Sequence, residues 1–212
     1  MEELTLLGER AVQAKYELQR MTTEKKNEVL EAVAEALIQN TEYLLLENQK
    51  DLERGIANQM NPGLVDRLRL TKERIAGMAE GIRQIVKLPD PVGEILDDYE
   101  AENGLHIVKK RVPMGVIGII YESRPNVTAD AFGLCFKSGS AVILKGGSDA
   151  IRSNMAITKV IQDAVVRKGV DPYVIQLIES TDRSVVNEFM KMKQYVDLLI
   201  PRGGAGLIRN VV

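Results

Sequence analysis

Two short apolar runs, separated by a segment of helical length, place the strongest constraint on how this chain can fold. Residues 115–120 have the sequence GVIGII and residues 141–144 the sequence AVIL. A run without polar alternation is typical of a strand that is buried on both faces of a parallel sheet. The segment 128–137 between them predicts a helix, with Thr128 as its N-cap and Gly139 suited to the left-handed position beyond its end. Together these features predict a β-α-β unit.

The first 90 residues have helical periodicity. Apolar residues recur three and four positions apart, which places them on one face of a helix. We expect helices over residues 3–20, 24–39, 41–56 and 71–86. The Asn-Pro-Gly sequence at 61–63 is expected to interrupt this pattern. The Pro-Asp-Pro sequence at 89–91 is expected to end it, because proline lacks an amide donor and restricts the residue before it.

A different pattern begins at Gly93. Residues 94–99 and 105–112 flank Asn103-Gly104, a dipeptide that tolerates the positive φ values of a tight turn and so predicts a β-hairpin. Charged residues dominate both arms, and a two-stranded ribbon is marginally stable alone. We therefore expect the hairpin to pack on a neighbour, for which a partner subunit is one candidate.

The remainder of the chain alternates helices with strands. We expect helices over 148–168 and 183–192, strands over 174–178 and 196–200, and the start of a helix over 207–212. Such alternation predicts a parallel, doubly wound sheet with right-handed crossovers. The predicted class is therefore α/β, with a helical segment (1–90), a hairpin extension (93–112) and a Rossmann-like sheet unit (113–212). Sheets of this kind bind ligands beyond the carboxyl ends of their strands.

Two glycine-rich turns follow predicted strands and are candidate ligand sites. Their residues are Lys145, Gly146, Gly147 and Ser148 in the first turn, and Arg202, Gly203 and Gly204 in the second. Glycine lets backbone amides approach a phosphate, a helix N-terminus adds partial positive charge, and the basic side chains add full charges. A turn that only redirects the chain is an equally good interpretation of each. Neither turn has the P-loop pattern or the complete Rossmann fingerprint.

The loop after the first buried strand offers two further candidates. Arg124 could pair with a phosphate or carboxylate, and Asn126 could donate to an oxyanion. Hydrogen bonds that merely cap the loop are the alternative. Cys135 is expected to be a buried, inert thiol, and His106, the one histidine, a structural residue, so we expect no metal site.

Composition excludes some classes of function. The chain has 28 basic and 30 acidic residues, which argues against a nucleic-acid-binding protein. Its apolar runs are far shorter than the roughly 18 residues that span a bilayer. One cysteine and an N-terminus unlike a signal peptide are typical of a cytoplasmic protein.

Residues 113–154 have the sequence PMGVIGIIYESRPNVTADAFGLCFKSGSAVILKGGSDAIRSN, and this segment resembles the gamma-glutamyl phosphate reductase family of the aldehyde dehydrogenase superfamily. The segments DRL (66–68), PDPVGEI (89–95) and VDLLIPRGG (196–204) resemble the same family. The resemblance implies NADPH-dependent reduction of L-glutamyl 5-phosphate to L-glutamate 5-semialdehyde and phosphate, a step of proline biosynthesis. In that reaction a cysteine thiolate displaces phosphate to form a thioester, which hydride from NADPH reduces.

The resemblance also assigns roles to the candidate residues. It implies that NADP(H) is bound by Lys145, Gly146, Gly147, Ser148, Arg202, Gly203 and Gly204. Within this set, Lys145 corresponds to the lysine that contacts the adenosine ribose, and Gly203 and Gly204 to the turn under the diphosphate. Gly147 and Ser148 leave room for a 2′-phosphate, although Asp149 is close. The oxyanion asparagine of the superfamily falls near Arg124 by spacing and on Asn126 by residue type, while Arg124 is also the substrate-binding candidate.

The family's chain is about twice as long, and its nucleophilic cysteine does not correspond to Cys135. The resemblance thus implies that residues 1–212 are a truncated cofactor-binding domain without the catalytic domain, and that the isolated chain is inactive. The 93–112 hairpin resembles the superfamily's oligomerisation ribbon, so a homo-oligomer is expected, and glutamate 5-kinase is an expected partner. A non-catalytic NADP(H)-binding or oligomerisation module is the alternative function.

Overall fold

The main sheet of the protein is parallel, as the sequence predicts. The computed structural model describes residues 2–211 and gives this sheet the strand order β5-β4-β3-β6. The strands are β3 (Val116–Tyr121), β4 (Ala141–Lys145), β5 (Ile175–Leu177) and β6 (Leu198–Arg202). The α/β class is therefore confirmed. The last strand begins two residues later than expected and includes Pro201. An edge strand tolerates proline, because the missing N–H can face the unpaired side of the strand.

The unbroken apolar sequence of the central strands reflects burial on both faces of the sheet. Side chains alternate between the faces of a strand, and both faces of β3 are covered. Ile117 and Ile119 belong to the larger apolar core, and Val116 and Ile120 to a second core on the opposite face. Every residue of β3 and β4 is buried.

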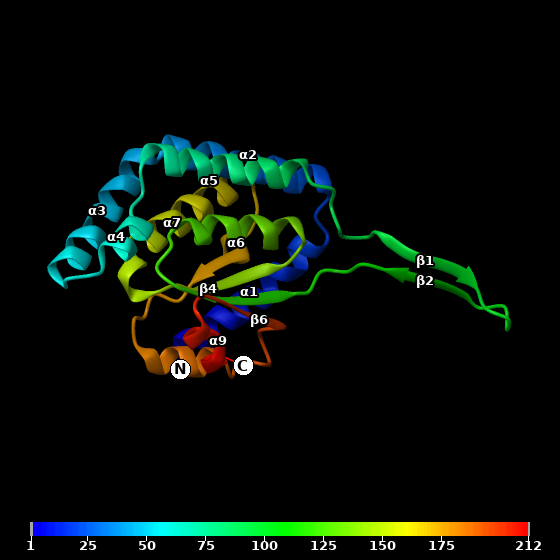
Figure 1. Ribbon diagram of the computed structural model, residues 1–212. Helices are drawn as coiled ribbons and strands as arrows, with labels where there is room; N and C mark the ends of the chain where they lie inside the picture. Colours follow the sequence, from blue (N-terminus) through cyan, green and yellow to red (C-terminus); the bar gives the residue numbers. More distant parts are fainter. Residues whose placement is uncertain (1, 212) are drawn as a thin grey trace.

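Helices form layers on the two faces (Figure 1). One face is covered by α6 (Asn126–Lys137) and α7 (Ile151–Arg167), over which pack α2 (Thr23–Gln39), α3 (Thr41–Ala57) and α5 (Lys72–Lys87). The other face carries α1 (Glu2–Gln19), α8 (Arg183–Phe189) and α9 (Ala205–Val211). Among the described residues, no helix has the length and apolar character needed to span a membrane.

Threonine side chains cap two helices of the first 90 residues, and residues 61–63 begin a helix that was not predicted. Thr22 caps α2 and Thr71 caps α5, each by accepting a hydrogen bond from an amide of the first turn. Residues 61–63 do not simply interrupt the helical pattern. Asn61 accepts from the Gly63 amide (2.8 Å) and starts a further helix, α4 (Pro62–Leu68), since Asn at the N-cap and Pro in the first turn favour helix initiation.

The predicted N-cap role of Thr128 is wrong. Helix α6 begins at Asn126, after Pro125, so Thr128 lies inside its first turn. The Thr128 side chain is buried, and its hydroxyl lies 2.7 Å from the Tyr121 hydroxyl and 3.2 Å from Asn154 Oδ1. It therefore joins β3 to α7 instead of capping a helix. The other end of α6 agrees with the prediction, because Gly139 has a φ of 73°.

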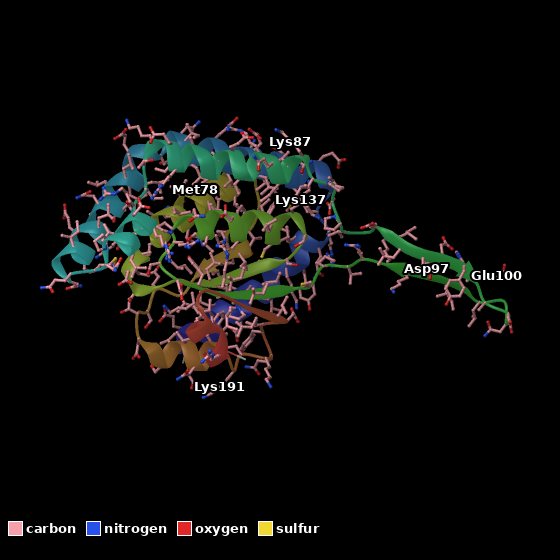
Figure 2. The ribbon with its side chains drawn as sticks, in the orientation of Figure 1. Met78, Lys87, Asp97, Glu100, Lys137 and Lys191 are labelled. Atoms are coloured by element: carbon pink, nitrogen blue, oxygen red, sulfur yellow. The ribbon has the colours of Figure 1, made fainter. Side chains whose placement is uncertain are left out.

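The predicted hairpin is present and extends away from the sheet unit (Figures 1 and 2). Strands β1 (Ile95–Glu100) and β2 (His106–Lys110) pair antiparallel, and every residue in them is exposed. The long helix after β4 also differs slightly from expectation. A 3-10 turn, η1 (Ser148–Ala150), precedes α7, and another, η2 (Pro172–Val174), precedes β5.

Candidate functional site

The strand order creates a crevice at the carboxyl ends of β3 and β6. The chain moves outward from β3 through β4 to β5 and then returns to the other side of β3 at β6. Doubly wound sheets bind ligands at such a reversal. A cavity of about 370 Å³ opens there. It is lined by Arg67, Tyr121, Glu122, Arg124, Val127, Arg202, Gly203 and Gly204. We call it the β3–β6 cavity.

An anionic oxygen already occupies the second glycine-rich turn. The Gly204 amide donates to Oε1 of Glu122 at 2.8 Å. A Cβ at position 203 would lie 2.8 Å from the Glu122 carboxyl carbon, so glycine is needed for this close approach. The chain itself therefore supplies an acidic group at this turn, and binding of a ligand anion there stays a prediction. The sequence analysis missed Glu122, because the contact joins residues 82 positions apart.

Lys145, the last residue of β4, is a buried cation. Its side chain is 5% exposed, and Nζ donates to the carbonyl of Gly146 at 3.0 Å. No carboxylate of the described chain lies within ion-pair distance of it. Burial lowers the pKa of the Lys145 ammonium. A buried ammonium with one protein acceptor retains donors for a ligand hydroxyl or phosphate, so this geometry fits a ribose contact.

The glycines that follow Lys145 are required by packing within the chain. A Cβ on Gly146 would clash with the amide nitrogen of Asn154, and one on Gly147 would lie 2.8 Å from Oγ of Ser123. These contacts press the turn against the β3 loop and α7. Internal packing alone accounts for both glycines, and their role in ligand binding stays a prediction.

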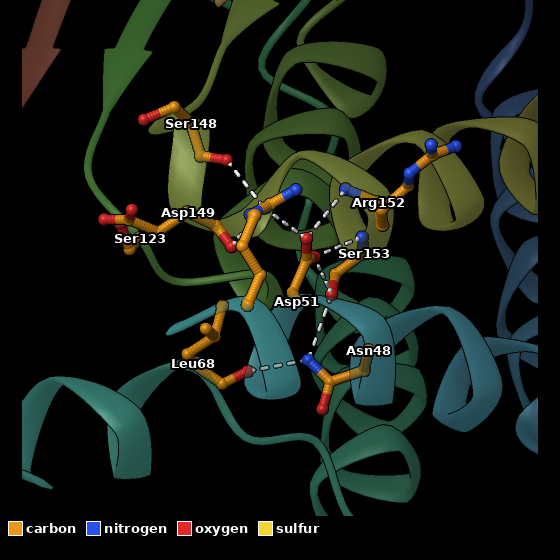
Figure 3. A network of polar contacts seen from close by, with 9 residues as sticks. Asn48, Asp51, Leu68, Ser123, Ser148, Asp149, Arg152 and Ser153 are labelled. Atoms are coloured by element: carbon orange, nitrogen blue, oxygen red, sulfur yellow. Dashed lines mark hydrogen bonds and ion pairs between the residues drawn. The ribbon is translucent and has the colours of Figure 1, made fainter. Parts of the chain in front are cut away.

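The expected contribution of a free helix N-terminus at this turn is wrong. Asp51 of α3 is fully buried and accepts from the Ser153 amide (2.8 Å), the Ser153 hydroxyl (2.7 Å) and the Arg152 amide (3.3 Å) (Figure 3). A carboxylate from another helix thus caps α7 and offsets the positive end of its dipole. Ser148, which is exposed, uses its carbonyl to accept from Arg54 (3.0 Å).

The polar loop after β3 places its two candidate residues at a second cavity. Arg124 is exposed, and Asn126 opens α6 with its amide donating to Oδ2 of Asp130 (3.0 Å). Burial raises the pKa of Asp130, opposed by the hydrogen bond from Asn126 and the charge of Arg202. The Asn126 amide therefore already has an acceptor, and its oxyanion role stays a prediction.

The second cavity, of about 430 Å³, contains arginines that the sequence analysis missed. Arg67 and Arg69 line it together with Arg74, Arg124, Asn126 and Asp130. We call it the arginine cavity. A signal was available in the sequence RLRL at 67–70: the leucines are buried and both arginines are exposed. Alternation of this kind places the basic residues on one side of the backbone.

The two remaining candidates are Cys135 and His106. Cys135 is buried, and burial raises the pKa of its thiol to about 12, so it is not a thiolate near neutral pH. His106 lies on the exposed hairpin beside Asp98. Within residues 2–211, no group of three or more potential metal-binding side chains occurs.

Comparison with known proteins supports the resemblance. The model of the aldehyde dehydrogenase family matches residues 2–211. A gamma-glutamyl phosphate reductase of Clostridium botulinum (strain Eklund 17B / Type B) is 51% identical over 212 residues, which is 100% of this chain and 51% of the relative. The enzyme of that name from Lachnospira eligens is 55% identical over the same shares of both chains.

Solved structures show the same fold. The crystal structure of gamma-glutamyl phosphate reductase from Thermotoga maritima superposes with a TM-score of 0.96 at 41% identity, covering 99% of this chain and 50% of that one. The Saccharomyces cerevisiae enzyme gives a TM-score of 0.90 at 30% identity, covering 98% and 53%. This chain thus spans about half the length of these relatives. Matched from residue 2 to residue 211, it belongs to the aldehyde dehydrogenase family.

Proposed function

We propose that this chain forms the cofactor-binding part of a cytoplasmic gamma-glutamyl phosphate reductase. The reaction is reduction of L-glutamyl 5-phosphate to L-glutamate 5-semialdehyde and phosphate. One observation carries the proposal: the whole chain is 51% identical to enzymes of that name. Members of the aldehyde dehydrogenase family use a nicotinamide cofactor, and the β3–β6 cavity is where a doubly wound sheet binds one.

NADP(H) is the proposed cofactor, which when bound would supply the hydride for reduction of the acyl carbon. The Lys145 ammonium would donate to the ribose, next to Gly146, Gly147 and Ser148. The turn of Arg202, Gly203 and Gly204 would hold the diphosphate, at the place where the Gly204 amide donates to the Glu122 carboxylate. Asn126 and Arg124 line the adjoining arginine cavity, and we propose that they face the reacting carbon.

The attacking thiolate must come from outside these 212 residues. Cys135 is the only cysteine in the chain, it is buried, and burial raises its pKa to about 12. We therefore expect no NADPH formation by the isolated chain with glutamate semialdehyde, phosphate and NADP. Measurable turnover would show that residues 1–212 contain a nucleophile of another kind.

Titration of the chain with NADPH, followed by cofactor fluorescence, tests the cofactor proposal. We expect saturable binding that Lys145→Ala weakens about tenfold, because one charge-assisted hydrogen bond is lost. Lys159→Ala, at an exposed position of α7, is the matched control and should change nothing. Absence of NADPH binding, or equal binding by the two variants, would contradict the proposal.

An interaction role of the hairpin is a second candidate function. Ile95, Tyr99, Leu105, Ile107 and Val108 are exposed there, and an exposed ribbon with apolar side chains fits a partner surface. We propose a homo-oligomer formed through residues 93–112, with glutamate 5-kinase as a further partner. Ile107→Asp should lower the sedimentation mass of the chain to that of a monomer. An unchanged mass would exclude the hairpin as the contact.

A further inference from the structure

The connection between α4 and α5 presents two arginines to the cavities described above. Arg67 lines both the β3–β6 cavity and the arginine cavity, and so does Arg124. Of these two cavities, Arg69 lines the arginine cavity and not the β3–β6 cavity. The two cavities therefore adjoin at Arg67 and Arg124, and Arg69 lies on the side away from the strand ends.

The backbone that carries these arginines is held in place from several sides. The buried Asn48 side chain donates to the Leu68 carbonyl at 2.8 Å (Figure 3). It also accepts from the Leu70 amide at 2.8 Å. Arg74 donates to the Arg69 carbonyl at 2.7 Å. Buried polar groups whose hydrogen bonds are all made restrict backbone movement. The backbone that carries Arg67 and Arg69 is therefore held in one position.

The charge of the arginine cavity is not neutralised by its own walls. Arg74 is paired with the Asp66 carboxylate at 3.1 and 3.2 Å. For Arg67, Arg69 and Arg124, no carboxylate of the described residues lies within ion-pair distance, and all three side chains are exposed. A guanidinium group can donate two parallel hydrogen bonds to two oxygens of the same phosphate or carboxylate. A ligand with more than one anionic group fits this arrangement.

We propose that Arg67 and Arg124 bind the phosphate of the substrate and that Arg69 binds its α-carboxylate. The assignment rests on the proposed function and follows from where the cavities meet. The acyl carbon first loses phosphate to the thiolate and later receives hydride, so it must face the cofactor in the β3–β6 cavity. The phosphate that this carbon carries in the substrate would then lie at the shared wall. The other end of L-glutamyl 5-phosphate then extends into the arginine cavity, whose volume of about 430 Å³ accommodates a small molecule.

Two stable probes separate the two contacts. Inorganic phosphate carries only the phosphate group. The analogue 2-amino-6-phosphonohexanoate carries a terminal phosphonate and an α-carboxylate at the spacing of the substrate. Both are titrated into the 212-residue chain by calorimetry, against Arg67→Gln, Arg69→Gln and the remote control Arg167→Gln. Thermal melts of the variants check that these surface substitutions leave the fold intact.

Arg67→Gln should weaken binding of both probes about tenfold, since each loses a charge-assisted contact. Arg69→Gln should weaken only the analogue, and Arg167→Gln neither probe. Equal effects of Arg67→Gln and Arg167→Gln, or no binding of the analogue by the wild-type chain, would overturn the inference. A separate NADPH titration keeps the cofactor proposal distinct: if NADPH binds and the analogue does not, only the substrate assignment fails.

Discussion

At the residue scale, Lys145 combines a proposed cofactor-binding position with a cost in stability. A buried ammonium loses hydration, and Lys145 regains one hydrogen bond, to the Gly146 carbonyl, without a carboxylate partner in the described chain. Buried charges of this kind destabilise a fold unless they are paired. Their retention is typical of ligand-binding positions, where affinity and stability oppose each other.

Lys145→Met should therefore raise the free energy of unfolding by about 1 kcal/mol at pH 7. Burial lowers the pKa of Lys145 below 10.5, so the cost is present while the amine is charged. This cost to wild-type stability is lost as pH rises through the lowered pKa of Lys145. The stability advantage of Lys145→Met over the wild type should therefore shrink as pH rises. Urea unfolding at pH 7 and pH 10 measures this, with the exposed Lys159→Met as control. A gain that stays constant with pH would contradict the electrostatic explanation.

Glu122 should compete with the cofactor diphosphate. Its carboxylate accepts from the Gly204 amide, at the turn proposed to hold that group. Glu122→Gln keeps the size of the side chain and removes its charge. We expect NADPH to bind about threefold to tenfold more tightly, because the variant removes the repulsion between the Glu122 carboxylate and the cofactor diphosphate. Glu179→Gln, at an exposed position beyond β5, is the charge-matched control. Weaker NADPH binding by Glu122→Gln would show that this carboxylate belongs to the cofactor site.

At the element scale, α3 organises both sides of the site. Asp51 caps α7, and Asn48, one turn earlier, holds the segment that carries the arginines (Figure 3). The two side chains also share Ser153, whose hydroxyl donates to Asp51 and lies 3.0 Å from the Asn48 amide nitrogen. One helix face therefore sets the position of the turn after β4 relative to the arginine cavity.

Asp51→Asn should destabilise the protein by about 2–3 kcal/mol. The substitution replaces charge-assisted hydrogen bonds with weaker ones and leaves Arg54, 2.6 Å from the carboxylate, without its ion pair. Denaturant unfolding measures the loss. Asp163→Asn, on the exposed side of α7, should change stability by less than about 0.5 kcal/mol. Similar losses in both variants would show that the cap contributes little.

At the scale of the whole molecule, a buried ion pair joins the helical segment to the sheet unit. Lys26 Nζ lies 2.9 Å from Oδ2 of Asp90 and 3.3 Å from the carbonyl of Lys137 at the end of α6. Thr23 and the Val92 amide also donate to the Asp90 carboxylate. The Pro-Asp-Pro segment, predicted only to end a helix, thus also connects the two parts of the fold.

Asp90→Asn should cost about 3–5 kcal/mol, because it leaves the Lys26 ammonium buried without a counter-ion. Burial raises the pKa of Asp90, but hydrogen bonds from Lys26, Val92 and Thr23 have a larger opposite effect. The pKa of Asp90 is therefore lowered below 3.8. The contribution is therefore complete above about pH 4 and lost as pH falls through the lowered pKa. Unfolding curves between pH 3 and pH 7 should converge for wild type and variant. Parallel curves would contradict this.

Much of the architecture follows from local sequence. The uninterrupted apolar runs of β3 and β4, the caps Thr22 and Thr71, and the hairpin around Gly104 were predictable because each depends on residues close in sequence. Thr128 shows the limit of such reasoning. Its hydroxyl could cap a helix locally, but Pro125 lets α6 start earlier and the buried partners Tyr121 and Asn154 use the hydroxyl instead.

The sequence by itself determined the parallel α/β class, the two glycine-rich turns and the resemblance to a reductase family. Only the tertiary structure decided what surrounds those turns. Glu122 accepts from an amide of one turn, Asp51 caps the helix beyond the other, and Arg67 and Arg124 line the same two cavities. These contacts join residues tens of positions apart. Periodicity and capping rules describe neighbours along the chain, whereas charge and packing in a site depend on which distant residues the fold brings together.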